Sequence, residues 1–137
     1  MPHDPARVDE TRAWLAKASE DLRAAQLLAN AATPLLDNAA FHAQQAVEKA
    51  MKGYLVWHDV VFRRTHDLTE VGQQCAGVDA SLEPLCKRAE RLSVFAWSSR
   101  YPGDPSEPDA DEVRETLAVA QEVLDEVLLR LPPEVRP

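Results

Sequence analysis

Apolar residues recur at steps of three and four along most of the chain, which is the spacing of one face of an α-helix. The spacing predicts helices over residues 9–30, 38–58 and 109–131. Pro34 and Pro132 follow the first and the last of these helices, and proline cannot continue a helix. The predicted core-facing residues are Trp14, Ala18, Leu22, Ala25 and Leu28 in the first helix, Val47, Met51 and Tyr54 in the second, and Val113, Leu117, Ala120, Leu124, Val127 and Leu131 in the last.

Shorter apolar stretches in the middle of the chain predict two further helices. Thr65 is placed to cap the first of them, and Ser81 is placed to cap the second. The segment 100–108 is rich in proline and predicts a loop. Because no strand-like alternation is present, we expect an all-α fold, an antiparallel up-and-down bundle of four to five helices.

A chain of 137 residues with 45% apolar content fits one domain with one core. The pattern predicts a single helical domain over residues 1–137, with its core over about 9–131 and a flexible tail over 132–137. Small residues in the second helix, among them Ala43 and Ala50, predict close approach of a neighbouring helix.

The formal net charge is -8, so repulsion from phosphates opposes broad, non-specific binding to nucleic acid. Contact with a nucleotide or RNA phosphate therefore requires a local basic patch. The first residues lack the basic start and apolar stretch of a signal peptide, and no apolar run approaches the roughly 20 residues that cross a bilayer. We therefore expect a cytoplasmic protein that does not enter a membrane.

The helix predicted over 38–58 carries a polar stripe as well as an apolar one. At about 100° per residue the stripe is roughly 80° wide. Glu48 lies at its edge and is spaced to pair with Lys52 one turn later. An ordinary solvated face is the alternative interpretation of this pattern. The residues of the stripe are His42, Gln45, Lys49 and Lys52.

Two more polar clusters would suit a phosphate group and a base, if the fold brings them to this stripe. Arg63, Arg64 and His66 follow the second helix, and Arg100 and Tyr101 follow the fourth. Arginine binds phosphate in a bidentate fork, and a tyrosine ring can stack on a base. The alternatives are that Arg100 pairs with the acidic loop after it, that Tyr101 packs that loop, and that His66 bonds only nearby backbone.

Four stretches carry a resemblance to a known family. Residues 18–25 read ASEDLRAA, of the form A-x-x-D-L-x-x-A, and residues 41–52 have the form F-x-A-Q-Q-A-x-E-K-x-x-K. Residues 65–68 read THDL and residues 99–102 read SRYP. In this order they resemble the motifs of the HEPN domain family, the higher eukaryotes and prokaryotes nucleotide-binding domain.

The resemblance implies a bundle of four or five helices that often dimerises and is proposed to bind nucleotides. It also implies a partner, because such domains frequently work beside a small nucleotidyltransferase made as a separate chain. The residues that it places in the ligand-binding site are Gln45, Lys49, Lys52, His66, Arg100 and Tyr101.

The chain departs from the family at the point that decides on catalysis. Many HEPN proteins are metal-independent ribonucleases with the motif R-x(4–6)-H, in which arginine stabilises phosphate charge and histidine transfers a proton. No arginine of this chain has a histidine five to seven positions later. The sequence also has no P-loop, nucleophile elbow or metal-binding cluster, so we expect no catalytic residue, no cofactor and no metal.

Three hypotheses follow from these patterns. The first is a non-catalytic HEPN-type module that binds a nucleotide, partners a nucleotidyltransferase, or both. The second is a ribonuclease toxin of a toxin–antitoxin pair that uses a non-standard arrangement of arginine and His66. The third is a homodimeric scaffold without a ligand. The first requires that the stripe, the THDL turn and the SRYP corner meet at one accessible pocket, with Lys49 and Lys52 not consumed by internal ion pairs.

Overall fold

The computed structural model describes residues 2–98, 101–103 and 107–137, and within them it contains five α-helices and no strand. The all-α prediction is confirmed. In these described ranges every helix is too short or too polar to traverse a lipid bilayer. The elements in chain order are α1 (Pro5–Ala29), α2 (Leu36–Trp57), α3 (Leu68–Val78), the 3-10 turn η1 (Ala80–Leu82), α4 (Glu83–Ala89), the 3-10 helix η2 (Glu90–Ala96), α5 (Ala110–Leu129) and the 3-10 turn η3 (Pro133–Val135).

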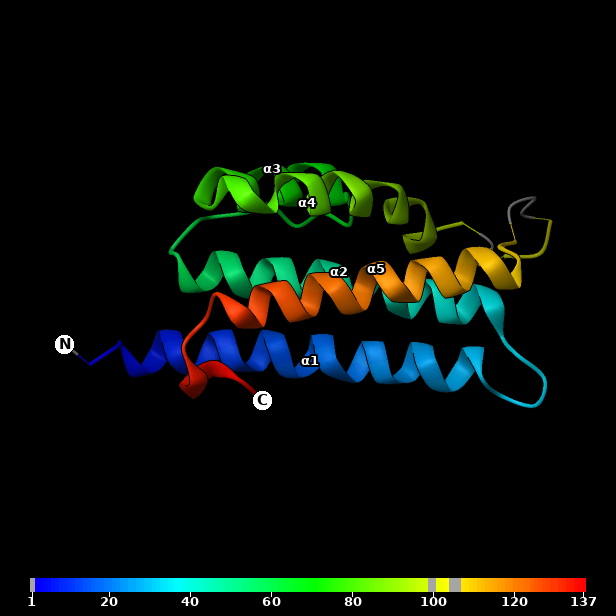
Figure 1. The fold of residues 1–137 in the computed structure, drawn as a ribbon, viewed down its shortest axis with the longest axis horizontal. Helices are drawn as coiled ribbons and strands as arrows, with labels where there is room; N and C mark the ends of the chain where they lie inside the picture. Colours follow the sequence, from blue (N-terminus) through cyan, green and yellow to red (C-terminus); the bar gives the residue numbers. More distant parts are fainter. Residues whose placement is uncertain (1, 99–100, 104–106) are drawn as a thin grey trace.

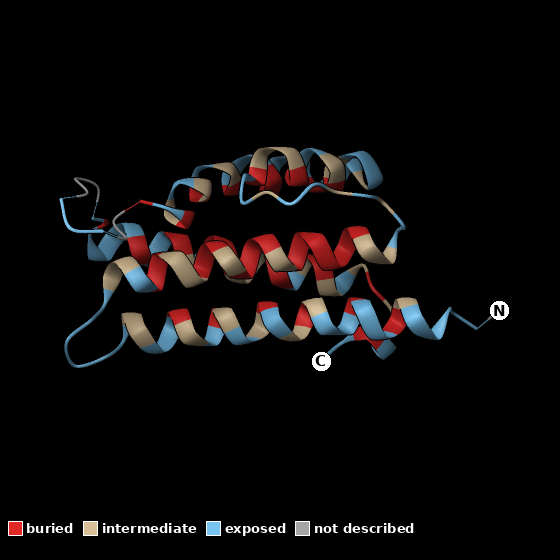
Figure 2. Ribbon diagram, turned by 180° about the vertical axis from the view of Figure 1, so that it is seen from behind, coloured by how far each residue is buried: buried red, intermediate tan, exposed pale blue. Residues whose placement is uncertain are grey.

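Helix α2 occupies the centre of the bundle. It packs against α1 and α5 on one side, while α3, α4 and η2 form a second layer over its other side (Figure 1). More than half of its residues are buried, including the polar Gln44, Glu48 and Lys52 (Figure 2). Of the stripe that the sequence marks as polar, Lys52 is buried, whereas His42, Gln45 and Lys49 are partly exposed.

Small residues let α1 and α2 approach closely, as the sequence predicts. Ala43, Ala46 and Ala50 are at most 1% exposed. A Cβ atom added to Gly53 would lie 3.1 Å from the Trp14 Cβ atom and 3.2 Å from Leu15 Cδ2. Glycine at position 53 is thus required by the distance between the two helices.

The apolar stripe of α1 is turned slightly from the predicted one. Ala18, Leu22 and Ala25 are buried as expected, but Leu15 rather than Trp14 is the large residue that is fully buried near the start of the helix. Trp14 stays partly exposed, because the close approach at Gly53 leaves no room for an indole between the helices.

Aspartates cap four of the described elements, α1, α3, η1 and α5, and two of these caps stand where the sequence pattern had favoured other residues. Asp67 caps α3 by accepting a hydrogen bond from the Thr69 amide at 2.9 Å, which corrects the assignment of that cap to Thr65. Asp79 caps η1 through the Ser81 amide at 3.0 Å, which corrects the assignment to Ser81. A carboxylate at N-cap accepts a charge-assisted hydrogen bond and also favours the positive end of the helix dipole.

The C-terminal segment is packed, which corrects the expectation of a loose tail over 132–137. Val135 in η3 is 0% exposed and belongs to the main core. The Arg12 guanidinium on α1 donates a hydrogen bond to the Glu134 carbonyl oxygen. The two prolines that end α5 therefore turn the chain back onto the bundle (Figure 1).

Candidate functional site

A buried carboxylate, Glu48, is the centre of the polar contacts on α2. Its side chain is 4% exposed and accepts hydrogen bonds through both oxygens. Oε2 lies 3.0 Å from Lys52 Nζ, and Oε1 lies 2.8 Å from His66 Nδ1 and 3.2 Å from Gln44 Nε2. The pairing of Glu48 with Lys52 that the sequence predicts is confirmed. A buried charge needs this number of partners to offset the loss of its hydration.

Lys52 is fully used within the fold. Its side chain is 8% exposed, and its ammonium also donates to the Thr65 carbonyl oxygen at 3.0 Å. The same ammonium lies 5.9 Å from the centre of the Trp14 ring and 5.5 Å from that of Phe62, within the range of a cation–π contact. Lys52 ties α2 to the connector before α3, and burial of its side chain keeps it from a ligand in solvent.

A second carboxylate, Asp21 on α1, holds the other half of the stripe. Its Oδ2 lies 2.6 Å from Lys49 Nζ and its Oδ1 lies 2.9 Å from His42 Nδ1. The Lys49 side chain is 25% exposed, so it is reachable but ion-paired. Both lysines of the stripe are therefore engaged in internal ion pairs, and the condition set for them in the sequence-based hypothesis is not met.

Two glutamines fasten the connector between α2 and α3. Gln44 Nε2 donates to the His66 carbonyl oxygen at 3.1 Å, and Gln45 Nε2 donates to Gln44 Oε1 at 2.6 Å. With the Lys52 bond to Thr65, two successive carbonyl groups of the connector accept hydrogen bonds from α2 side chains. The conformation of the connector is set by α2.

His66 is the candidate that remains open to solvent. Its side chain is 62% exposed although its Nδ1 atom is held by buried Glu48. When Nδ1 carries the proton that bonds the carboxylate, Nε2 is left as the nitrogen that meets solvent or a ligand. Arg64, two residues before His66 in the sequence, is exposed and has no hydrogen-bond or ion-pair partner among the described residues, whereas Arg63 binds Glu70 in a bidentate pair, with Nη2 2.6 Å from Oε2.

The third expected part of the site does not join this cluster. Tyr101 is 75% exposed, and among the residues that the structure describes it has no contact with Gln45, Lys49 or His66. The described segment 101–103 lies at the end of the bundle where α2 and α5 begin (Figure 1). Arg100 falls outside the described residues.

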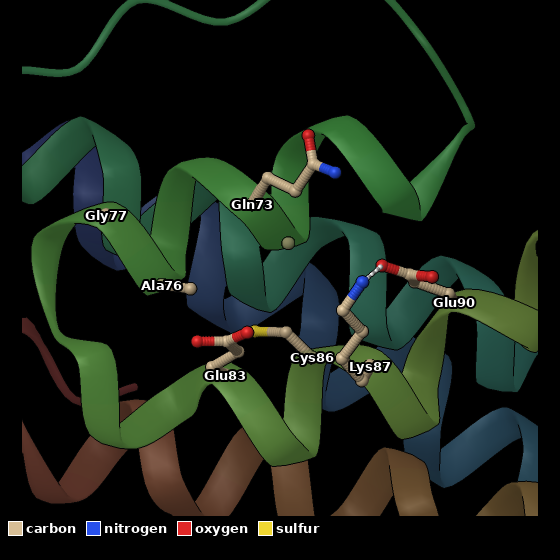
Figure 3. Close-up of a pocket in the computed structure, with 8 residues that line it drawn as sticks. Gln73, Ala76, Gly77, Glu83, Cys86, Lys87 and Glu90 are labelled. Atoms are coloured by element: carbon tan, nitrogen blue, oxygen red, sulfur yellow. Dashed lines mark ion pairs between the residues drawn. The ribbon is translucent and has the colours of Figure 1, made fainter.

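A separate groove between α3 and α4 has the wrong chemistry for a phosphate. The cavity measures about 320 Å³, and the carboxylates of Glu83 and Glu90 border it, with Lys87 paired to Glu90 at 3.8 Å (Figure 3). The Cys86 thiol in its wall has its pKa raised to about 11, by burial first and then by Glu90. This thiol is protonated near neutral pH and is a poor nucleophile. Within residues 2–98, 101–103 and 107–137 no cluster of three or more metal-ligating side chains is found.

The contacts bring in four groups that the candidate set did not contain, the first of which is Glu48, the partner of Lys52 and His66. Gln44, Asp21 and the Thr65 carbonyl hold residues of the set in place. Asp21 and Gln44 occupy motif positions quoted above, so the sequence could have identified them as candidates. A backbone carbonyl group leaves no mark in a sequence.

Comparison with known proteins gives one match. No curated protein and no solved structure matches the chain. A model of the HEPN domain matches residues 11–131, which is most of the chain and runs from the first turns of α1 to the end of α5. The chain belongs to the HEPN domain family.

Proposed function

We propose that this chain is a non-catalytic HEPN-type module that binds a nucleotide, or docks a small nucleotidyltransferase, at the face formed by His66 and Arg64. The observation that carries the proposal is the exposed His66 ring, fixed 2.8 Å from a buried carboxylate. A ring held in this way presents its second nitrogen at a defined position and loses little freedom on binding. A neighbouring exposed guanidinium adds a charge that suits phosphate.

The proposal divides the six candidate residues by role. Lys52 positions the connector and does not touch the ligand, because its side chain is 8% exposed and its ammonium bonds Glu48 and the Thr65 carbonyl. Gln45 and Lys49 border the ligand, since both are partly exposed on the same helix face. Tyr101 and Arg100 stay predictions that this proposal does not need.

Calorimetric titration with a panel of nucleoside monophosphates tests the proposal. The sharpest variant is His66→Asn, because the asparagine amide replaces Nδ1 against Glu48 and removes the outward nitrogen. We expect His66→Asn and Arg64→Ala each to weaken binding by roughly tenfold. His3→Ala is the matched control, because His3 is also an exposed histidine in an ion pair, 3.3 Å from Glu134.

Docking of a nucleotidyltransferase is tested separately from nucleotide binding. A nucleotidyltransferase encoded beside this chain is expected to co-purify with the wild type and to be lost with Arg64→Ala. Wild-type protein that binds neither a nucleotide nor such a partner would end the proposal.

A ribonuclease is the second candidate, and the same geometry favours it. A buried carboxylate holding an exposed imidazole, with Arg64 nearby, provides a base and a phosphate-binding charge without the family's usual motif. Purified protein that degrades tRNA or mRNA, with the activity lost in His66→Asn, would replace the binding proposal by this one. Intact RNA after prolonged incubation would dispose of it.

A homodimer is a further proposal, supported by apolar side chains that η2 leaves exposed. Val94 is 41% exposed and Trp97, directly after η2, is 55% exposed. Exposed tryptophan is enriched at interface hot spots. Sedimentation equilibrium is expected to give twice the chain mass, and Trp97→Asp is expected to return the monomer. A monomeric wild type at all concentrations would contradict the dimer.

A further inference from the structure

A cavity of about 260 Å³ between α1 and α2 takes no part in the contacts described above. It is lined by Glu10, Ala13, Trp14, Lys17 and Lys49. Its lining thus includes one indole ring, two lysine side chains and one carboxylate, that of Glu10. An aromatic surface flanked by positive charge is suited to a planar ring that carries a negative group.

The indole of Trp14 is held in place by its neighbours. The Phe62 ring meets it edge to face with the ring centres 5.9 Å apart, and the Lys52 ammonium lies 5.9 Å from its centre. The Trp14 Cβ atom is so close to Gly53 that any larger residue there would displace it. A stacking surface that is already fixed costs little conformational entropy when a ligand binds.

The two lysines differ in how firmly they are held. Lys17 is 68% exposed and pairs with the exposed Glu20 at 3.3 Å, three residues along the same helix. Exposed pairs of this kind contribute little, so the Lys17 ammonium is available to a phosphate. Lys49 is held at 2.6 Å by Asp21, and its side chain borders the cavity.

The cavity lies next to the connector that carries His66. The Lys52 ammonium links the Trp14 ring to the connector, because it lies 5.9 Å from the ring centre and donates to the Thr65 carbonyl oxygen at 3.0 Å. Thr65 immediately precedes His66. A single ligand that spans this distance would meet an aromatic surface at one end and an imidazole at the other.

We infer that this cavity is the subsite for the base of a nucleotide, which stacks on Trp14 while the phosphate lies at His66 and the Lys17 charge adds a long-range attraction to the anionic ligand. The inference rests on the proposed function for the phosphate, which is assigned to His66. It adds the chemical class of the other half of the ligand and a location on α1 that the family motifs do not mark.

The test uses the intact protein with AMP and with ribose 5-phosphate, which has no base. A variant with Trp57→Phe and Trp97→Phe keeps Trp14 as its one tryptophan. We expect AMP to quench its emission in a saturable way, and to bind roughly tenfold or more tightly than ribose 5-phosphate, because stacking contributes about 1–3 kcal/mol per base. Trp14→Leu is expected to reduce AMP binding to the level of ribose 5-phosphate.

Lys17→Ala provides a variant that leaves the packing of Trp14 untouched. We expect it to weaken AMP binding about threefold at low salt. Lys87→Ala is the matched control, because Lys87 on α4 is similarly exposed and forms a similar pair with Glu90, three residues later at the start of η2. It is expected to leave AMP binding unchanged.

The outcomes separate this inference from the proposed function. One outcome overturns the base subsite and leaves the phosphate site. In it, His66→Asn loses binding, while the protein with His66 intact binds AMP and ribose 5-phosphate with equal affinity and AMP does not quench Trp14. Quenching that survives His66→Asn at full affinity keeps the base subsite and removes the phosphate assignment. Absence of AMP binding to the wild type overturns both.

Discussion

Glu48 is the residue on which the buried polar contacts of α2 depend. Its carboxylate compensates the buried Lys52 ammonium and also holds the His66 ring. Desolvated ion pairs contribute little over an apolar pair, but removing one partner leaves a charge uncompensated. Glu48 therefore contributes most to the free energy of unfolding when Lys52 is present.

Glu48→Gln is expected to lower the free energy of unfolding by about 3 kcal/mol, because the Lys52 ammonium is then buried without a counter-charge. Urea denaturation measures this. The double variant with Lys52→Met is expected to recover part of the loss. Glu20→Gln, whose carboxylate is 72% exposed, is the control and should cost less than about 1 kcal/mol. A Glu48→Gln protein as stable as the control would contradict this role.

Asp79 gives the stability a dependence on acid pH. Hydrogen bonds from Ser81, and then from Arg130, lower the pKa of Asp79 to about 2. Because the pKa in the unfolded chain is higher, about 3.9, the ionised carboxylate stabilises the fold fully above about pH 4, and this contribution is lost as pH falls towards 2.

Asp79→Asn is therefore expected to flatten that part of the pH profile. Urea midpoints between about pH 5 and 3 should fall less steeply in the variant than in the wild type. Parallel profiles for the two proteins would show that Asp79 is not the group responsible.

The sequence identifies the residues of the polar stripe more reliably than it predicts their interaction partners and their burial. The spacing of Glu48 and Lys52 identifies their ion pair, because two residues four apart on a helix are neighbours whatever the fold. The pair of Lys49 with Asp21 joins α1 to α2 across 28 positions, and no local rule predicts it. The burial of Lys52 also depends on where the connector lies, which the sequence does not state.

At the scale of elements, the close contact of α1 with α2 depends on one glycine. Gly53→Ala would gain helix propensity, yet its new Cβ atom would stand 3.1 Å from the Trp14 Cβ atom, which is attached to the backbone and cannot swing away. We expect a net loss of about 1–2 kcal/mol from this overpacking.

Gly77→Ala in α3 is the matched comparison. A Cβ atom there meets nothing within 4 Å, so the same substitution should leave stability unchanged or raise it by up to about 1 kcal/mol. Thermal unfolding of both variants checks the contrast. Equal shifts for the two would mean that helix spacing at Gly53 does not limit the packing.

The long helices are predictable from the sequence because their apolar residues repeat over several turns. The ends of the helices and the short elements are not predictable in this way. Helix α1 begins at Pro5, four residues before the predicted start, because Asp4 caps it and proline is tolerated in a first turn. The segment after Ala89 continues as a 3-10 helix, and its apolar spacing resembles that of an α-helix.

At the scale of the whole molecule, the C-terminus completes the core. Truncation after Pro132 removes Val135, which is fully buried, and the carbonyl that binds Arg12. The loss is expected to be about 2 kcal/mol, the amount that burying a valine contributes. Truncation after Val135 is the control and should cost much less. Equal stability of the two truncated chains would show that η3 does not contribute.

Fold class and family follow from features spread over the whole chain, namely the apolar periodicity and the order of the motifs. The candidate site does not follow in the same way. Residues of one motif set differ in burial, because Lys52 is buried and Tyr101 is 75% exposed. Accessibility is a property of the packed molecule, so it had to come from the structure.

The most direct test of nucleotide binding at His66 and Trp14 is a two-dimensional ¹H–¹⁵N NMR titration of the intact protein with AMP. We expect saturable chemical-shift changes at the amides of Arg64, Thr65 and His66 and at the Trp14 indole N–H. The shifts of Gly72, Gly77 and other groups of the α3–α4 groove are expected to stay constant. Shift changes confined to that groove, or none at all at saturating nucleotide, would contradict binding at His66 and Trp14.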